Sequence, residues 1–508
     1  MGQCPADGPN PKIFSQLIPL SVKETSAMVA KGGVNPEIPG PAPAPLFGWR
    51  GNLLRYFRDP IRTMAQARER YGDLSCLAQG GNDSLIFQPL PQRSATLFAF
   101  GAANNRQVLT QPDLFESDVM RAPRQCPWLG DNMASANGSE RLQQRRTMMP
   151  ALTSEHLKAY HPYFVQLTDA MLDRWEVGQT LNLTDEIESL TSAIASQTFY
   201  GQVLGEDPDA LASLARQVAK AMFSPINQLP INLPGTPYRR FENLSKRAET
   251  SVLAEIERRR QGDSDGDDIL SMMLRAIDEG NVGISQRHLV GNAFTLFLAG
   301  HDVPANALGW TLYLLAQHPE VMADLLDELD EALGGEPPTY AQVFKLPLLD
   351  RVIRESMRVL SPAIILWRRT SAPTELNGYD IPVGSEVILS PYITHVDEDL
   401  FPRPLRFDPQ RWETGKKPSA FEFLPFSYGA RKCLGAAFAE IQLRITVAMI
   451  VQRFRLELIP DTQVDLSVTM TMKPKDGLPV IVRPQDRHHT RSKAPQRGAI
   501  GSMVDIDF

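Results

Sequence analysis

The chain has 508 residues, of which 43% are hydrophobic and 22% charged; these values are typical of globular proteins and exclude general disorder. The 52 basic and 59 acidic residues give a net charge of −7, which argues against a dedicated nucleic-acid binder or a polybasic membrane-binding protein. Four scattered cysteines, none with metal-ligand spacing, argue against a disulfide scaffold and favour a reducing compartment.

Along the chain, residues 1–37 have the composition of a flexible arm that ends at a proline-rich segment. Hydrophobic periodicity predicts helices over 53–73, most of 139–330, 347–360 and 434–454. Strands are expected within 82–116, around the Asn377-Gly378 turn and at 386–389, with a terminal hairpin over 468–482. Residues 484–508 are expected to form a flexible tail. These elements predict one large, mainly helical domain over residues 38–483 with a minor β region.

The longest apolar segment, from Leu289 to Leu315, is interrupted by polar residues that include His301 and Asp302. A bilayer span needs about 20 mostly apolar residues, so this segment is interpreted as a core helix with a polar middle. No secretory signal or membrane anchor is expected, and a soluble, cytoplasmic protein is predicted.

The stretch from Phe426 to Gly435 contains the cysteine with the most informative surroundings. Cys433 comes just before a predicted helix, whose N-terminus carries partial positive charge and unpaired N–H groups. These features, together with the neighbouring Arg431 and Lys432, should stabilise a thiolate and lower the pKa of the cysteine. Because glycine has no side chain, Gly435 lets a flat group approach the backbone. A lone thiolate beside open space is a ligand suited to a haem iron.

The pattern F-x-x-G-x-R-x-C-x-G in this stretch resembles the haem-thiolate signature of the cytochrome P-450 superfamily at every fixed position. The resemblance covers about residues 38–483 and implies a single-domain cytochrome P-450 fold. It implies haem b as the cofactor, with iron bound by the Cys433 thiolate. Phe426 and Gly435 are expected to contact the haem.

Two further motifs resemble those of the family and imply a buried charge triad. Glu355 and Arg358 belong to an E-x-x-R sequence, and Arg411 to a P-x-R-W sequence. Buried charges persist only when they are paired, so loss of any of the three should reduce haem retention.

The predicted core helix resembles the family's oxygen-binding segment at Ala299, Gly300 and Asp302. The small residues would let the helix pass close to the haem, and Asp302 is expected to relay protons through water. Where the family usually has threonine, this chain has Val303, which lacks the hydroxyl that helps to deliver protons. Pro304 also removes the N–H that would bind the Gly300 carbonyl. Three explanations stay open: proton delivery assisted by substrate or water, use of peroxide, and chemistry that needs no O–O cleavage.

Four arginines are expected to contact the haem carboxylates. Arg368 and Arg431 occupy positions that resemble the family's propionate contacts, and Arg141 and Arg145 lie in a stretch that resembles its G-x-x-W/H-x-x-x-R helix. A guanidinium binds a carboxylate well, so Arg141 can replace the more usual Trp or His. His395, at a position where the family commonly has a polar residue, is interpreted as structural.

By resemblance, a large apolar pocket holds the substrate, although some of its expected residues are alternatively plain core. The expected lining includes Phe294, Leu298, Ile364, Ile365 and Met470. Such a pocket suits a fatty acid, terpenoid, steroid or polyketide.

The resemblance therefore implies a haem-thiolate monooxygenase that inserts one oxygen atom from O2 into a hydrophobic small molecule. Electrons are expected from a separate ferredoxin or flavodoxin and its reductase, because no reductase domain is evident, and a monomer without nucleic acid is predicted. One alternative is a haem-thiolate enzyme of peroxide-driven oxidation, isomerisation or oxidative coupling. Another is a haem-binding sensor or carrier without catalysis.

Overall fold

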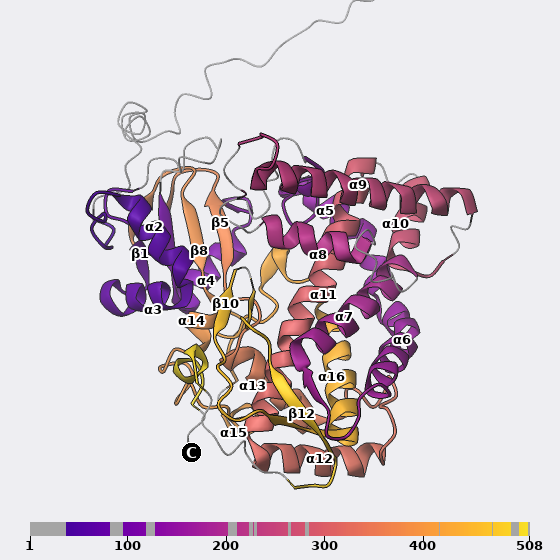
Figure 1. Ribbon diagram of the computed structural model, residues 1–508. Helices are drawn as coiled ribbons and strands as arrows, with labels where there is room; N and C mark the ends of the chain where they lie inside the picture. The colour runs from indigo at the N-terminus through magenta and orange to yellow at the C-terminus, as the bar shows by residue number, and fades with distance from the viewer. Residues whose placement is uncertain are drawn as a thin grey trace, which may run out of the picture.

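The computed structural model describes residues 37–81, 95–117, 127–201, 211–222, 227, 231–262, 266–279, 284–415, 417–469, 471–488 and 497–505. Helices make up most of the fold, and a twisted sheet lies at one corner beside α2 and α3 (Figure 1). Within these residues, no helix combines the length and the apolar character that a membrane span requires.

The longer helices have the following bounds: α2 Trp49–Arg58, α3 Pro60–Tyr71, α4 Gly101–Thr110, α5 Gly138–Met148, α6 Ser154–Leu172, α7 Leu183–Tyr200, α8 Leu211–Met222, α9 Pro237–Gly262, α10 Ile269–Asp278, α11 Gln286–Gln317, α12 Pro319–Leu333, α13 Pro347–Val359 and α16 Ala436–Arg453. The short helices are α14 Pro391–His395 and α15 Arg411–Thr414, with 3-10 turns at Pro127–Leu129, Met149–Leu152, Gly429–Arg431 and Ala499–Ser502.

The main sheet has the order β1-β2-β8-β5-β3, formed by Leu74–Cys76, Thr96–Ala99, Glu386–Leu389, Leu366–Thr370 and Phe115–Glu116. A second sheet, β4-β12-β9, is formed by Thr180–Asn182, Pro479–Pro484 and Phe454–Leu458. Two hairpins complete the strands: β6 (Thr374–Leu376) with β7 (Tyr379–Ile381), and β10 (Leu466–Val468) with β11 (Met472–Pro474). Asn377 and Gly378 both have positive φ in the β6–β7 turn, as the sequence predicts.

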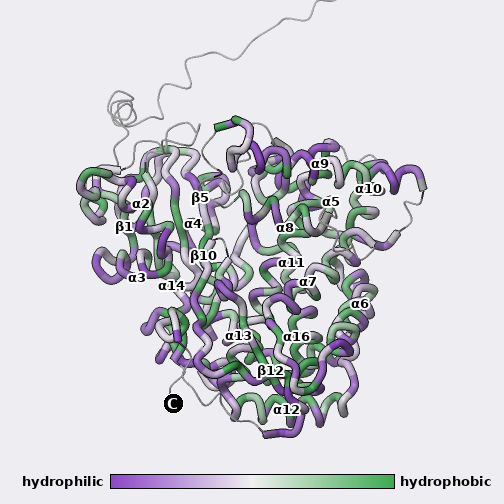
Figure 2. Tube along the Cα trace, viewed as in Figure 1, coloured by the Kyte–Doolittle hydropathy of each residue, from purple (hydrophilic) through white to green (hydrophobic). Residues whose placement is uncertain are grey.

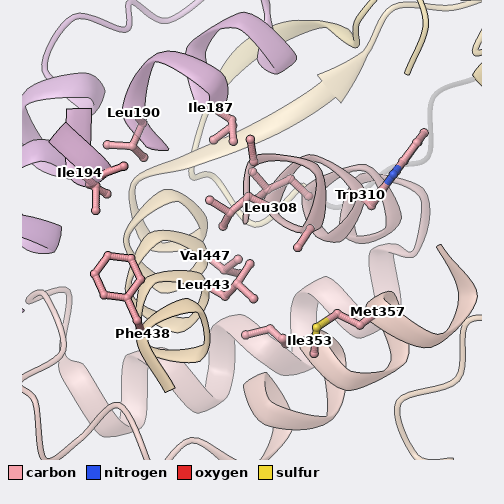
Figure 3. Close-up of a cluster of buried hydrophobic side chains, with 14 of the residues drawn as sticks. Ile187, Leu190, Ile194, Leu308, Trp310, Ile353, Met357, Phe438, Leu443 and Val447 are labelled. Atoms are coloured by element: carbon pink, nitrogen blue, oxygen red, sulfur yellow. The ribbon is translucent and has the colours of Figure 1, made fainter. Parts of the chain in front are cut away.

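The core lies where α7, α11, α13 and α16 meet (Figure 3). Leu190 and Ile194 of α7 approach Leu308 of α11, while Leu443 and Val447 of α16 fill the space between the helices. The second half of α11 is buried on nearly all sides, and most of its residues are accordingly apolar. The outer helix α9 is in contrast largely hydrophilic (Figure 2).

Two boundaries differ from the sequence predictions. The predicted helix 53–73 is two helices, because Pro60 begins a new one and the Asp59 side chain accepts a hydrogen bond from the Arg62 N–H at 3.0 Å. The predicted terminal hairpin over 468–482 is wrong, since β10 pairs with β11 and β12 joins β9 and β4 in another sheet. Apolar alternation indicates strands but does not identify their partners.

The expectation of a flexible tail is wrong for residues 497–505. Ile500, Met503 and Val504 are buried in the main hydrophobic core. The Asp505 N–H donates to the carbonyl of Leu405 at 2.9 Å, and the Val464 N–H donates to the carbonyl of Arg497 at 2.8 Å. The segment is mostly polar, but burial of these three apolar side chains is enough to attach it to the core.

Candidate functional site

The loop that carries Cys433 is held in shape by its own backbone. The Cys433 N–H donates to the Phe426 carbonyl at 2.9 Å, and the Lys432 N–H donates to the Gly429 carbonyl at 3.0 Å. Gly429 has φ +71°, and a methyl group placed there would lie 2.5 Å from the Leu109 carbonyl oxygen of α4. Glycine is therefore required at this position both by conformation and by space.

Cys433 combines an exposed surface with close surroundings of protein. Its surface is exposed, yet burial raises the pKa of its thiol, so the sulfur is accessible while protein surrounds it. The Gly435 N–H donates to the sulfur, and the charges of Arg145 and Lys432 also favour the thiolate. Burial outweighs these effects, so the predicted lowering of the Cys433 pKa is wrong for the protein alone. A metal cation would reverse the balance, because a coordinating thiol is deprotonated.

The one other cysteine among the described residues does not share this setting. Cys76 is buried, with its sulfur 3.6 Å from the Ile38 carbonyl oxygen, and burial raises its pKa to about 11. Cys4 and Cys126 lie outside the described residues. Beside Cys433, a methyl group placed on Gly435 would meet no atom within 4 Å, so this side of the loop borders space that a flat group can fill.

Helix α11 has an open arc in the middle of an otherwise buried stretch. Over residues 295–303 only Phe297 and His301, which face α7, are buried. The others keep exposed surface and cover about half of the helix circumference, at the angles expected from 3.6 residues per turn. We define the open arc by these residues: Thr295, Leu296, Leu298, Ala299, Gly300, Asp302 and Val303.

The structure gives Gly300 a role that the sequence did not indicate. A methyl group placed on Gly300 would lie 2.4 Å from the Phe199 ring of α7. The glycine therefore permits close packing of α11 on α7, while Ala299, the most open residue of the arc, leaves the surface free. Gly300 thus acts through helix packing rather than only by leaving room for a ligand.

Asp302 also has a partner that the sequence did not reveal. The Thr471 hydroxyl, in the turn between β10 and β11, donates to the Asp302 carboxylate at 2.9 Å. These residues lie 169 positions apart, so no local pattern connects them. Val303 lies on the open arc and brings no hydroxyl to it.

Three predicted arginines form a cationic cluster, in which Arg141 and Arg368 are buried and Arg431 is partly buried. Burial and neighbouring arginines lower the pKa of Arg141 and of Arg368 to about 10, and that of Arg431 to about 9. The positive charges of Arg368 and Arg141 both lower the pKa of Arg431, which shows that the three charges lie close together. Buried like charges repel one another, so the cluster favours binding of an anion.

The arginines are oriented by carbonyl groups. Arg141 donates at 2.9 Å to the carbonyls of Met133 and Ala430, and Arg431 donates to the carbonyl of Ala136 at 2.8 Å and to the Asn137 side chain.

Arg141 and Arg431 each keep a buried Nε–H without a hydrogen-bond partner. Arg145 lies nearer the surface and donates to the Lys432 carbonyl at 3.0 Å. Two free donors in a cationic cluster fit the carboxylates of a haem.

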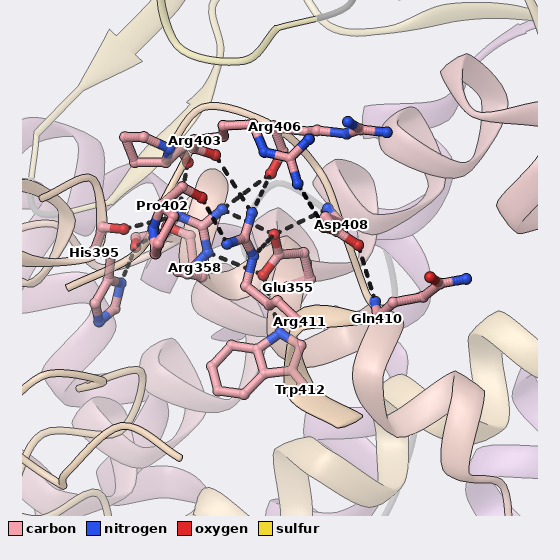
Figure 4. Close-up of polar contacts among 12 residues, drawn as sticks. Glu355, Arg358, His395, Pro402, Arg403, Arg406, Asp408, Gln410, Arg411 and Trp412 are labelled. Atoms are coloured by element: carbon pink, nitrogen blue, oxygen red, sulfur yellow. Dashed lines mark hydrogen bonds and ion pairs between the residues drawn. The ribbon is translucent and has the colours of Figure 1, made fainter. Parts of the chain in front are cut away.

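The predicted triad is assembled around Glu355 (Figure 4). Arg358 donates to both carboxylate oxygens at 2.8 and 2.9 Å, and Arg411 donates to one at 2.7 Å. Trp412 adds a hydrogen bond of 2.9 Å, a contribution that the motif did not identify. The remaining donors of both arginines bind carbonyls of the 402–406 segment and of His395. Each charged side chain of the triad is thereby held by hydrogen bonds, as its burial demands.

His395 connects the triad to the cysteine loop. Its carbonyl accepts from Arg358 at 2.8 Å, and its ring accepts from the Leu424 N–H at 2.9 Å. The other ring nitrogen lies 2.9 Å from the Ser361 hydroxyl, and burial lowers the His395 pKa to about 3. The ring is therefore neutral and structural, and it fixes the backbone two residues before Phe426.

The expected pocket residues fall into two groups. Phe294, Ile364 and Ile365 are buried in the core, Phe294 edge-to-face with Trp128 at 5.1 Å. Leu298 lies on the open arc, and Met470 lies outside the described residues.

Comparison with known proteins agrees with this geometry. The family model of cytochrome P450 matches residues 38–481. The chain is a cytochrome P450. Members of this family carry a haem with a cysteine thiolate as axial ligand, and the exposed sulfur, the cationic cluster and the open side of Gly435 fit that group.

This P450 is similar to cyclooctat-9-en-7-ol 5-monooxygenase of Streptomyces melanosporofaciens, with 30% identity over 85% of this chain and 93% of the relative. It is 28% identical to pentalenene oxygenase of Streptomyces avermitilis, over 71% of this chain and 81% of the relative. The solved structure of retinoic acid-bound cyanobacterial CYP120A1 shares the fold, with a TM-score of 0.77, 24% identity, and coverage of 88% of this chain and all of the other. The enzyme is thus a P450 monooxygenase, and the predicted mainly helical fold is confirmed.

Proposed function

We propose that this P450 oxidises a cyclic terpenoid, inserting one atom of O2 as a hydroxyl or epoxide. The observation that carries the proposal is the open arc of α11, which is mostly apolar and bears two polar residues, Thr295 and Asp302. Such a surface accepts a bulky hydrocarbon skeleton and orients it through few polar contacts. The names of two relatives, a cyclooctat-9-en-7-ol monooxygenase and a pentalenene oxygenase, support this substrate class.

Each part of the site has a role in this proposal. Cys433 binds the iron, and Arg141, Arg368 and Arg431 hold the haem carboxylates. Haem, when bound, supplies the redox chemistry that activates O2. Asp302 moves protons toward the open arc, and the apolar arc residues exclude bulk water from the reacting carbon. Glu355, Arg358 and Arg411 hold the framework behind the cysteine loop.

Electrons are proposed to come from a separate ferredoxin or flavodoxin. Lys432 of the cysteine loop, Arg106 of α4 and Arg146 of α5 are exposed, and they present positive charge on a protein with a net charge of −7. This local contrast favours docking of an acidic electron carrier and should make the rate of reduction decrease with salt. A cytoplasmic location and a monomeric state stay predictions.

Val303 favours one second candidate, peroxide-driven oxidation. We would therefore offer cyclic terpenes, terpene alcohols and fatty acids to the haem-loaded enzyme in two parallel reactions. One contains ferredoxin, reductase and 18O2, and the other contains hydrogen peroxide alone. Label in a terpenoid product of the first reaction only would support the proposal. Product with peroxide only would replace it by the second candidate, and oxidation of fatty acids alone would contradict the substrate class.

Cys433→Ser and Cys76→Ser form a matched pair for this experiment. The first should abolish the absorbance that the thiolate ligand gives to the reduced carbon monoxide complex, together with product formation. The second removes a buried cysteine outside the proposed site and should preserve both. If Cys433→Ser kept the thiolate absorbance, the assignment of the ligand would be wrong.

A further inference from the structure

Asp302 is held from outside its own helix. Thr471 donates its hydroxyl to the Asp302 carboxylate at 2.9 Å, and Thr471 is 8% exposed. The hydrogen bond is therefore partly shielded from bulk water and is stronger than on a surface. Its consequence is that the carboxylate has a defined direction at the flank of the open arc.

The backbone at Thr471 and Met472 is held by two other segments of the chain. Thr471 forms a β-bridge with Ala363, and the Met472 N–H donates to the Pro362 carbonyl at 3.0 Å. The Trp310 ring N–H, two turns after Asp302 on α11, donates to the Met472 carbonyl at 2.9 Å. A hydroxyl on so fixed a backbone imposes its position on its partner rather than following it.

The pair also has a charged connection toward the surface. Two residues after Thr471, the Lys473 ammonium lies 3.0 Å from the Glu188 carboxylate of α7, and both side chains are partly exposed. Although burial lowers the pKa of Lys473, Glu188, Asp302 and Asp185 together raise it. Asp302 thus interacts electrostatically with a partly exposed cation, in addition to accepting the hydrogen bond from Thr471.

On this basis we propose that Thr471 is the positioning residue for Asp302, and that proton delivery in this enzyme depends on a hydroxyl from the β10–β11 turn. The inference rests on the proposed function, because it assigns Asp302 to proton delivery. It accounts for the valine at position 303: the hydroxyl that contacts the carboxylate comes from another part of the fold. Thr471 acts through Asp302, and the proton moves through the carboxylate and water.

The test compares Thr471→Val, which removes the hydroxyl at nearly constant shape, with Thr471→Ser, which keeps it. Thr469→Val is the matched control, because Thr469 lies in the same turn and is exposed. Removing one hydrogen bond to a charged group should lower product formed per electron pair about fivefold or more. Serine should restore at least half of the wild-type value, and the control should leave it unchanged. Asp302→Asn should have a similar effect, and adding Thr471→Val to it should cause no further loss.

A second measurement does not depend on turnover. In the reduced enzyme, the stretching frequency of added carbon monoxide reports hydrogen-bond donors and charges near the ligand. Thr471→Val and Asp302→Asn should shift this frequency, whereas Thr471→Ser and Thr469→Val should not, and haem content should be equal in all variants. If no tested terpenoid is oxidised, the proposed function fails while this shift still supports the positioning role. If Asp302→Asn changes coupling and frequency but Thr471→Val changes neither, the positioning role is overturned and the proposed function stands.

Discussion

Replacing Arg368 with methionine should have opposite effects on the protein with and without haem. Arg368 is 6% exposed, and burial together with the charge of Arg141 lowers its pKa from 12.5 to about 10. Each pKa unit corresponds to about 1.4 kcal/mol, so the charged guanidinium destabilises the haem-free protein by about 3 kcal/mol. Methionine fills a similar volume without charge. The haem-free variant should therefore be up to about 3 kcal/mol more stable, less the loss of the 2.7 Å hydrogen bond to the Trp367 carbonyl.

In the haem-loaded protein the same change should remove the proposed contact of Arg368 with a haem carboxylate. A charge-assisted hydrogen bond contributes about 1.5–3 kcal/mol, so haem should dissociate about 10- to 100-fold faster. Urea unfolding of the haem-free protein and transfer of haem to an excess of apomyoglobin measure the two effects separately. Arg369→Met is the matched control, because that side chain is 28% exposed and lies 3.6 Å from Glu116. If the haem-free variant lost stability, the cluster would already be neutralised within the protein, and the reasoning from unpaired charge would be refuted.

Three further outcomes are expected. Gly435→Ala should leave the stability of the haem-free protein unchanged but hinder haem uptake. Gly300→Ala should destabilise the protein both with and without haem, because the added methyl group would meet the Phe199 ring. Equal losses of stability for the two variants in urea unfolding of the haem-free protein would contradict the expectation for Gly435. Because burial lowers the His395 pKa to about 3, the unfolded state takes up a proton first, so stability falls as the pH drops from about 6.5. The difference in unfolding free energy between wild type and His395→Gln should therefore shrink from pH 7 to pH 4, and a constant difference would exclude this cause. The tail contacts the 402–406 segment, whose carbonyls bind the triad arginines, through the Asp505 N–H and the Leu405 carbonyl. Val504→Asp, which buries a charge, should therefore cost about 3 kcal/mol and speed haem loss, while Ser502→Asp on the exposed side should do neither. Similar haem transfer rates in the two variants would show that the tail does not hold the 402–406 segment.

The sequence alone determined those features that depend on residues close together in the chain. The helix from Pro347 follows from its apolar spacing, and Glu355 and Arg358 lie one turn apart on it. The loop around Cys433 depends on glycines and a cysteine within ten positions, which is why the signature is readable without any tertiary contact. The main helices and the β6–β7 turn were predicted for the same reason.

Tertiary structure decided everything that depends on what surrounds these residues. The raised pKa of Cys433 reflects burial, which no local pattern reports, and it reverses the expectation from the helix N-terminus. Gly300 is explained by the Phe199 ring, and Asp302 is held by Thr471, which is 169 positions away. Spacing along a helix or loop fixes the local direction of a side chain, whereas its neighbours across the core are set only when the whole chain packs.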